Sequence, residues 1–243
     1  MRIKLIVEYD GTAYSGWQMQ DNARTVQGEV EHALKLLTGE NIVVFSAGRT
    51  DKGVNAMGMA VHFDIDCTIP TEKFALILNN VLPPDIRAIS SEQVHNEFHA
   101  RYSAKGKQYV YKIYNAANAS AIYRNTTMHI PVPLNIKAMK QAAKYFEGTQ
   151  DFAAFCATGS KVKSTVRTVS SVEIDEQLPI ISISVTGNGF LYNMVRIMAG
   201  TLIDVGKGKL KPEQIPEIIK SLDRTKAGIT AEPQGLTLMK VFY

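Results

Sequence analysis

The stretch Arg2-Ile3-Lys4-Leu5-Ile6-Val7-Glu8-Tyr9-Asp10 places an apolar side chain at every second position from Ile3 to Tyr9. Successive side chains of a strand point to opposite faces, so a period of two predicts a strand with one buried face. The segments on its C-terminal side decide which fold this strand belongs to.

The next segments complete a β-α-β-β-α-β order. Thr25 caps a helix with an apolar stripe from Val26 to Leu37, and Gly39 ends it. A second helix opens at Thr71 and stops before Pro83-Pro84. Strands are expected at residues 42–45, 57–63 and 86–94. This order is that of a ferredoxin-like, or RRM-like, sheet.

The second half repeats the theme loosely. Strands are expected at residues 109–113, 168–174, 180–186 and 236–242, and helices at residues 135–146, 190–205 and from 212 onward. We therefore expect an α+β protein of two βαββαβ halves, residues 1–104 and 105–243. The halves are expected to share a mainly antiparallel sheet, with helices on one side and a central cleft.

Composition excludes several classes of protein. The chain has 243 residues, of which 45% are hydrophobic and 21% charged, which is ordinary globular usage. The net charge of +4 is compatible with a polyanionic partner but does not demand one. The sequence has no membrane-span pattern, signal-peptide pattern or metal-binding motif, so we expect a cytoplasmic protein without a metal site, and with Cys67 and Cys156 as buried free thiols.

The densest group of reactive side chains lies in Ser46-Ala47-Gly48-Arg49-Thr50-Asp51-Lys52-Gly53-Val54-Asn55-Ala56. Its glycines let a ligand approach the backbone, and Arg49 and Lys52 are suited to holding phosphates. Neighbouring cations favour the ionised form of Asp51, which a carboxylate nucleophile needs. Composition alone favours a solvated hairpin turn, with an anion-binding, reactive loop as the alternative.

Five landmarks make the whole chain resemble the tRNA pseudouridine synthase A family, in the order and spacing of that family. They are Arg49-Thr50-Asp51-Lys52-Gly53-Val54; Glu8-Tyr9-Asp10-Gly11-Thr12 with Ser15-Gly16-Trp17; Phe98-His99-Ala100-Arg101 with Tyr109-Val110-Tyr111; Asn193-Met194-Val195-Arg196; and Gly235-Leu236.

The resemblance implies an enzyme that isomerises uridine to pseudouridine in the anticodon arm of tRNA, at positions 38 to 40, without a cofactor and as a homodimer. It also implies that Asp51 is catalytic, that Tyr109 lies in the uridine pocket and that Arg196 pairs with Asp51. Arg49 and Leu236 are expected to bind substrate.

Each role has a chemical basis. Pseudouridine formation breaks the C1′–N1 bond, rotates the uracil and joins C5 to C1′. One carboxylate suffices to attack the sugar or to deprotonate it, and the sequence leaves both open. Tyr109 can stack on the detached uracil and help to remove the C5 proton. The alternative interpretation of Tyr109 is an aromatic residue that packs across the strands of the sheet. Arg196, on an apolar helix, is either a surface arginine or the partner of a carboxylate.

RNA binding needs cations along a surface. We expect Arg24, at the start of the first helix, Lys52, Lys105 and Lys107 to contact RNA. Three groups of cations suggest a backbone track, although each alone is typical of a solvated face: Arg101, Lys105, Lys107 and Lys112, interleaved with tyrosines; Lys161, Lys163 and Arg167; and Lys207, Lys209 and Lys211.

One residue departs from the family pattern: Asn55 stands where the family commonly has histidine, which is consistent with a divergent paralogue and bears on target choice. Two other functions remain open. One is a non-catalytic RNA-binding or tRNA-folding protein on the same scaffold. The other is a small-molecule enzyme that binds a nucleotide phosphate, which the absence of a phosphate-loop motif disfavours.

Overall fold

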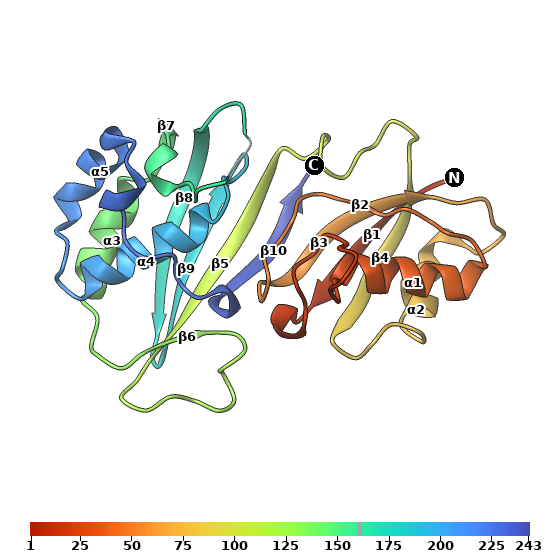
Figure 1. The fold of residues 1–243 in the computed structure, drawn as a ribbon, viewed down its shortest axis with the longest axis horizontal. Coiled ribbons are helices and arrows are strands. Elements are labelled where there is room, and N and C mark those ends of the chain that lie inside the picture. Colours follow the sequence, from red (N-terminus) through yellow and green to blue (C-terminus); the bar gives the residue numbers. More distant parts are fainter. Residues whose placement is uncertain (160–161) are drawn as a thin grey trace. The chain divides into compact units, whose positions relative to one another are not determined.

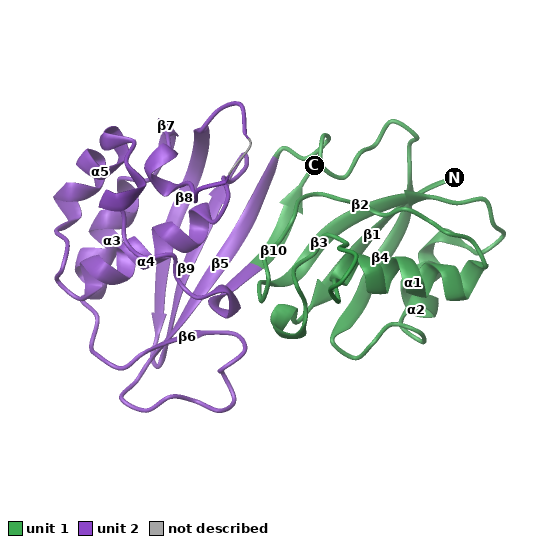
Figure 2. Ribbon diagram, viewed as in Figure 1, with its two compact units in different colours: residues 1–105, 238–243 green, residues 106–237 purple. Residues whose placement is uncertain are grey.

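The computed structural model describes residues 1–159 and 162–243, and Lys161 therefore lies outside the described residues. The chain forms two compact units (Figure 2): unit 1 comprises residues 1–105 and 238–243, and unit 2 comprises residues 106–237. No helix in the described part of the chain is long and apolar enough to cross a membrane.

Unit 1 is a sheet with helices packed on one face (Figure 1). Its strands follow the order β4-β1-β3-β10, with β2 also paired to β3, and β1 pairs antiparallel with both β3 and β4. Its elements are β1 (Arg2–Tyr9), α1 (Val26–Thr38), β2 (Phe45–Ser46), β3 (Asn55–Asp64), α2 (Phe74–Leu78), β4 (Ile86–Val94) and most of β10 (Leu236–Phe242), with 3₁₀ turns at Gly11–Ala13 and Thr71–Lys73.

The alternation in β1 is what builds this core. Ile3, Leu5 and Val7 are fully buried, and their partners across the ladder are Phe63, Val61 and Met59 of β3. Burying each such side chain contributes roughly 1.5–3 kcal/mol, so a one-residue slip of register would expose the whole row. The predicted cap is also confirmed, because the Thr25 side chain accepts a hydrogen bond from the Gly28 N–H.

The strands of unit 2 follow the order β5-β9-β8-β7 within the same ten-stranded sheet, each neighbouring pair among them is antiparallel, and β6 adds a short parallel pair to β5. The predicted α+β class and mainly antiparallel pairing are thus confirmed.

The elements of unit 2 are β5 (Gly106–Asn115), β6 (Met128–Ile130), α3 (Ile136–Lys144), β7 (Gly148–Asp151), β8 (Val166–Gln177), β9 (Ile180–Gly187), α4 (Met194–Gly206) and α5 (Ile215–Ser221), with 3₁₀ turns at Ala153–Phe155, Pro212–Gln214, Arg224–Lys226 and Pro233–Gly235.

Several predicted boundaries were wrong. The strand expected at residues 42–45 is Phe45–Ser46, because Ile42 and Val44 are buried without joining the ladder. The helix expected from residue 190 begins at Met194, since Asn193 adopts a left-handed backbone conformation with φ of 59°. Cys67 and Cys156 are free as expected, but both are half-buried rather than buried.

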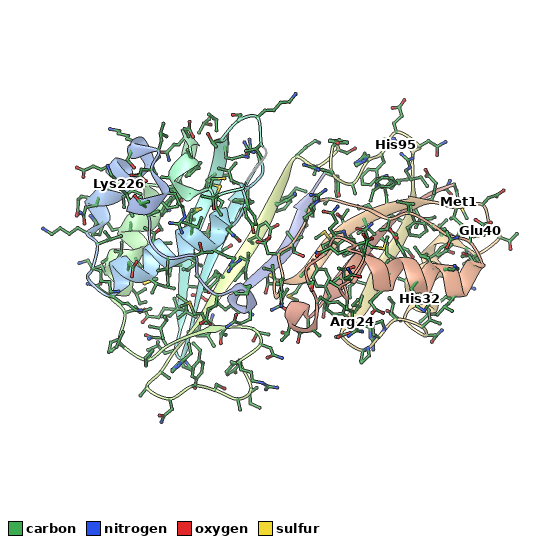
Figure 3. The ribbon with its side chains drawn as sticks, viewed as in Figure 1. Met1, Arg24, His32, Glu40, His95 and Lys226 are labelled. Atoms are coloured by element: carbon green, nitrogen blue, oxygen red, sulfur yellow. The ribbon has the colours of Figure 1, made fainter. Side chains whose placement is uncertain are left out.

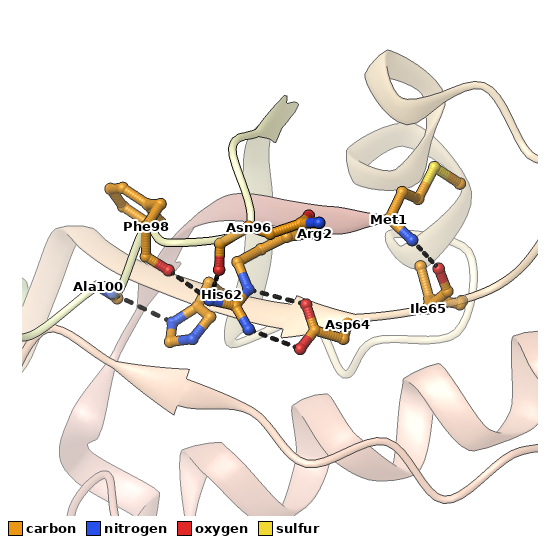
Figure 4. A network of polar contacts seen from close by, with 8 residues as sticks. All are labelled: Met1, Arg2, His62, Asp64, Ile65, Asn96, Phe98 and Ala100. Atoms are coloured by element: carbon orange, nitrogen blue, oxygen red, sulfur yellow. Dashed lines mark hydrogen bonds and ion pairs between the residues drawn. The ribbon is translucent and has the colours of Figure 1, made fainter.

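A polar network fixes the chain after β4 to the sheet face that the helices of unit 1 leave uncovered (Figure 4). Arg2 forms a two-point ion pair with Asp64 and donates to the carbonyl oxygens of Phe98 and Asn96. His62 Nδ1 accepts a hydrogen bond of 3.1 Å from the Ala100 N–H. Burial, followed by the neighbouring His99 and Arg2, lowers the pKa of His62 to about 4.

The depressed pKa of His62 predicts a loss of stability in acid. Between about pH 6.5 and 4 the unfolded chain binds a proton at this side chain and the folded chain does not, so stability falls as pH falls through that window. The contribution is up to about 3 kcal/mol. As the pH falls through this range, the free energy of unfolding measured with urea should decrease less for His62→Gln than for the wild type.

The control is His32→Gln, at an exposed histidine on α1 (Figure 3). It should follow the wild-type pH dependence. Parallel pH curves for the wild type and His62→Gln would contradict the assignment.

Candidate active site

Asp51 lies in the loop that joins β2 to β3, between two exposed cations. Thr50 is buried and Asp51 half-buried, whereas Arg49 and Lys52 are exposed. The Val54 N–H donates to the Asp51 carbonyl oxygen at 3.1 Å, which closes a tight turn through Gly53 (φ of 79°). Only glycine adopts this backbone conformation without strain, so the turn holds Asp51 at its apex.

The segment after β1 holds the backbone on the N-terminal side of Asp51. The Trp17 N–H donates to the Thr50 carbonyl oxygen at 3.1 Å, and the hydroxyls of Tyr9 and Thr50 are 2.7 Å apart. A Cβ atom added to Gly16 would lie 2.6 Å from that same carbonyl oxygen, so the two backbones touch only because residue 16 is glycine.

The same segment also holds the C-terminal side of the loop. The Gly11 N–H donates to Asn55 Oδ1 at 2.8 Å, and a Cβ atom at Gly11 would lie 2.1 Å from the Val54 carbonyl oxygen. Asn55 is only 6% exposed. Asn55, the residue that departs from the family pattern, therefore contacts the backbone of the segment after β1 from the interior of unit 1.

Residues 9–17, which we call the bracing segment, thus pack directly against the Asp51 loop. In the sequence the two segments appear only as separate landmarks. Contacts to Thr50 on one side and to Val54 and Asn55 on the other fix the chain around Asp51. These contacts fix the backbone that carries Asp51 and so limit where its carboxylate can lie.

The charges beside Asp51 remain available to a ligand. Arg49 and Lys52 form no ion pair with any residue in 1–159 or 162–243. Within those ranges, no three His, Cys, Asp or Glu side chains lie close enough together to hold a metal ion. The loop is therefore a carboxylate with two exposed cations.

Tyr109 lies on β5 of unit 2, opposite Val185 of β9. It is 9% exposed, and its ring meets the ring of Phe190 edge to face, with centroids 5.3 Å apart. Phe190 lies just beyond the end of β9, and sequence analysis missed it. The only signal was an aromatic residue next to the glycine turn that ends a strand.

Arg196 is half-buried on α4, and its hydrogen bonds include two to neutral acceptors of unit 2. Its Nε donates to the Ala231 carbonyl oxygen at 2.7 Å, and its Nη1 donates to Asn193 Oδ1 at 2.8 Å. The segment that carries Ala231 lies close to α4, because a Cβ atom on Gly200 would be 1.9 Å from the Ile229 carbonyl oxygen. Two neutral acceptors thus orient the guanidinium.

Leu236 begins β10 and is 7% exposed. Gly235 lets the preceding turn pack on the buried ring of Tyr111, because a Cβ atom there would be 2.7 Å from Tyr111 Cζ. The Tyr111 hydroxyl donates to the Glu232 carbonyl oxygen at 2.8 Å. Tyr111 therefore packs in the core, and it supports the turn that leads to Leu236.

The residues predicted to contact RNA differ in their surroundings. Arg24 forms an ion pair of 2.7 Å with Glu29, lies 3.7 Å from Asp85 and sits over the Tyr14 ring, at the start of α1 (Figure 3). Two carboxylates therefore share its charge. Lys52 and Lys105 are exposed, and Lys107 is half-buried on β5.

The structure therefore brings Arg49, Asp51 and Lys52 together in unit 1, and it places Tyr109, Arg196 and Leu236 in unit 2.

Comparison with known proteins matches this chain to the family model described as tRNA pseudouridine synthase, over residues 5–103 and 142–243. A curated relative named tRNA pseudouridine synthase A from Ruminiclostridium cellulolyticum is 55% identical over 243 residues, covering 100% of this chain and 99% of the relative. Relatives with the same name from Acetivibrio thermocellus and Thermoanaerobacter sp. are 48% and 50% identical, each covering 99% of both chains.

Among solved structures, a chain of a Cbf5–Nop10–Gar1 complex is 14% identical with a TM-score of 0.37, covering 97% of this chain and 57% of that chain; so low a score supports no argument about the fold. The relatives match along nearly the whole length, and both they and the family model cover residues 9–17 and the loop that carries Asp51. This chain belongs to the tRNA pseudouridine synthase family.

Proposed function

We propose that this chain isomerises uridine to pseudouridine in tRNA, with Asp51 as the catalytic carboxylate and without a cofactor. The observation that supports it most is the bracing of the Asp51 loop on both sides by residues 9–17. Rigid placement of one carboxylate between exposed cations suits a reaction at the sugar of a nucleotide whose phosphates must also be held.

The proposed reaction conserves the atoms of the base. Asp51 acts at the ribose, either as the nucleophile at C1′ or as a base, while the C1′–N1 bond breaks. The uracil then turns and C5 bonds to C1′: on the nucleophilic path the bond between Asp51 and C1′ breaks at this step, and on the base path Asp51 returns the proton that it took from the ribose. On both paths the C5 proton leaves and N1 gains a proton. Tyr109, with Phe190 against its ring, is proposed to stack on the uracil and to assist removal of the C5 proton. Leu236 is proposed to form an apolar wall of the pocket.

Arg196 is proposed to pair with Asp51 and to orient its carboxylate. Support comes from the hydrogen bonds to Ala231 and Asn193, which fix the guanidinium before substrate binds. In this proposal residues 1–104 and 105–243 act on the same uridine, because each supplies part of the machinery.

The proposed substrate is the anticodon stem-loop of tRNA, at positions 38 to 40, and the proposed assembly is a cytoplasmic homodimer whose subunits together hold the tRNA. Arg49 and Lys52 are proposed to contact the phosphates beside the target uridine, and Arg24, Lys105 and Lys107 to contact the backbone farther away. Support comes from the exposure of Arg49, Lys52 and Lys105, which form no ion pair within the described ranges.

Asp51→Asn should abolish isomerisation, because an amide is neither a nucleophile nor a base at the sugar. The measurement is the release of tritium from C5 of uridine-labelled tRNA, without added cofactor or metal. The Kd for tRNA should stay within about two-fold of wild type, because phosphate contacts dominate affinity.

The matched control is Asp21→Asn, which removes an exposed carboxylate elsewhere in unit 1 and should leave tritium release unchanged. Wild-type release by Asp51→Asn would exclude Asp51 as the catalytic group. Tight tRNA binding without release by the wild type would favour a non-catalytic RNA-binding protein.

Arg196→Gln should lower the single-turnover rate by about 100-fold, because a misplaced reactive group costs about that much. The acid limb of its pH–rate profile should also move to higher pH, since a carboxylate ionises less readily without an adjacent cation. Affinity for tRNA should change little.

Arg224→Gln is the control, because Arg224 donates to the Gly228 carbonyl oxygen and the Thr230 hydroxyl and so holds the same segment that Arg196 contacts. This variant should keep the wild-type pH profile. Identical pH profiles for both variants would show that Arg196 only supports that segment.

A further inference from the structure

The sheet face that α1 and α2 leave uncovered carries stacked rings. Phe45 of β2 pairs with His62 of β3, and their rings stack with centroids 5.1 Å apart and planes at 23°. His62 is 2% exposed, whereas Phe45 is 48% exposed. The buried imidazole therefore supports a phenyl ring that faces solvent.

The segment after β4 extends this group of rings. The His99 ring lies 4.7 Å from the His62 ring and 5.8 Å from the Phe45 ring, and the Tyr102 ring lies 4.4 Å from His99. Tyr102 is 78% exposed. We call Phe45, His99, Tyr102 and Arg101 the ring surface, with His62 as its support.

The ring surface is held in place without a ligand. His99 Nδ1 accepts hydrogen bonds from the N–H groups of Arg101 and Tyr102, and the Ser103 hydroxyl accepts one from the His99 N–H. The bond from the Ala100 N–H to His62 ties the segment to β3 (Figure 4). Pre-organisation of this kind lowers the entropic cost of binding.

The ring surface has exposed cations in it and beside it. The Arg101 guanidinium lies 5.9 Å from the Tyr102 ring, and both Arg101 and Lys105 are exposed. Neither forms an ion pair with any residue that the structure describes. Burial and the neighbouring arginines lower the pKa of His99, so the imidazoles act as uncharged rings at neutral pH.

We propose that the ring surface binds unpaired bases of the RNA substrate by stacking, with Arg101 and Lys105 on the adjoining phosphates. Every base has a π face that an exposed ring can cover, and a cation beside the rings suits the backbone that joins the bases. Phe45 and Asp51 are six positions apart, so their Cα atoms lie at most about 22 Å apart and the surface would hold nucleotides near the target uridine. This inference rests on the proposed function for the identity of the RNA.

The rival occupant is a second copy of this chain. Contact between copies would bury Phe45 and Tyr102 as well, but a two-fold contact brings the same surface of both chains together and so places the cations of one ring surface against those of the other. Arg101 and Lys105 lie beside the rings without an ion pair to any described residue, and a polyanion complements them better.

The test uses Phe45→Ala and Tyr102→Ala in the full chain, with Phe45→Tyr and Tyr102→Phe as variants that keep a ring. Leu36→Ala, at an exposed leucine of α1, controls for the loss of surface apolar area. Binding of an anticodon stem-loop RNA is measured by fluorescence anisotropy at fixed salt, together with oligomeric state by sedimentation and folding by urea unfolding.

Each alanine variant should weaken RNA binding by about ten-fold or more, whereas the ring-keeping variants and Leu36→Ala should stay within about two-fold of wild type. Wild-type affinity in folded Phe45→Ala and Tyr102→Ala would overturn the proposal. Dissociation of an oligomer without loss of RNA affinity would assign the surface to a second copy and overturn it equally.

Tritium release separates the two proposals. If the wild type is active and the alanine variants bind RNA normally, only the ring surface is wrong. If the wild type binds RNA through the rings but releases no tritium, the proposed function is wrong and the surface stands.

Discussion

The close approach of two backbones organises unit 1: residues 11 and 16 lie against the chain on either side of Asp51. A Cβ atom at Gly11 or Gly16 would stand 2.1 Å or 2.6 Å from a carbonyl oxygen of the loop. The alternation in β1 makes this approach possible, because its buried row fixes where the strand ends and the bracing segment begins. The packing of β1 in the core therefore also determines the position of the loop that carries Asp51.

In unit 2, too, glycines allow close backbone contacts next to the proposed functional residues. Gly200 brings the segment around Ala231 against α4, and that segment then orients Arg196. Gly235 lets a turn lie on the Tyr111 ring and so sets where Leu236 begins its strand. In both units a glycine permits a close backbone contact, and that contact helps to place a side chain for which we propose a role in reaction or binding.

Strands and helices with clear periodicity could be predicted from the sequence. β4 and β10 have their predicted bounds, and the helix expected from residue 135 is α3, capped by the Asn135 side chain, which accepts a hydrogen bond from the Ala138 N–H. β6 and β7 could not be predicted, because three or four residues give no period to detect. Asp51 stood out through its charged neighbours, but the bracing by Gly11 and the inward Asn55 arise from contacts between segments far apart in sequence.

Residues 9–17 brace the loop that carries Asp51, and in the proposed reaction this bracing positions the carboxylate. Gly16→Ala and Gly39→Ala both place a side chain at positive φ, but only residue 16 meets the loop, since a Cβ atom at Gly39 would have nothing within 4 Å. The decisive measurement is the single-turnover rate of pseudouridine formation at saturating tRNA for both folded variants. Positioning by residues 9–17 predicts a fall of about 100-fold for Gly16→Ala and none for Gly39→Ala. Equal rates in the two variants would contradict it.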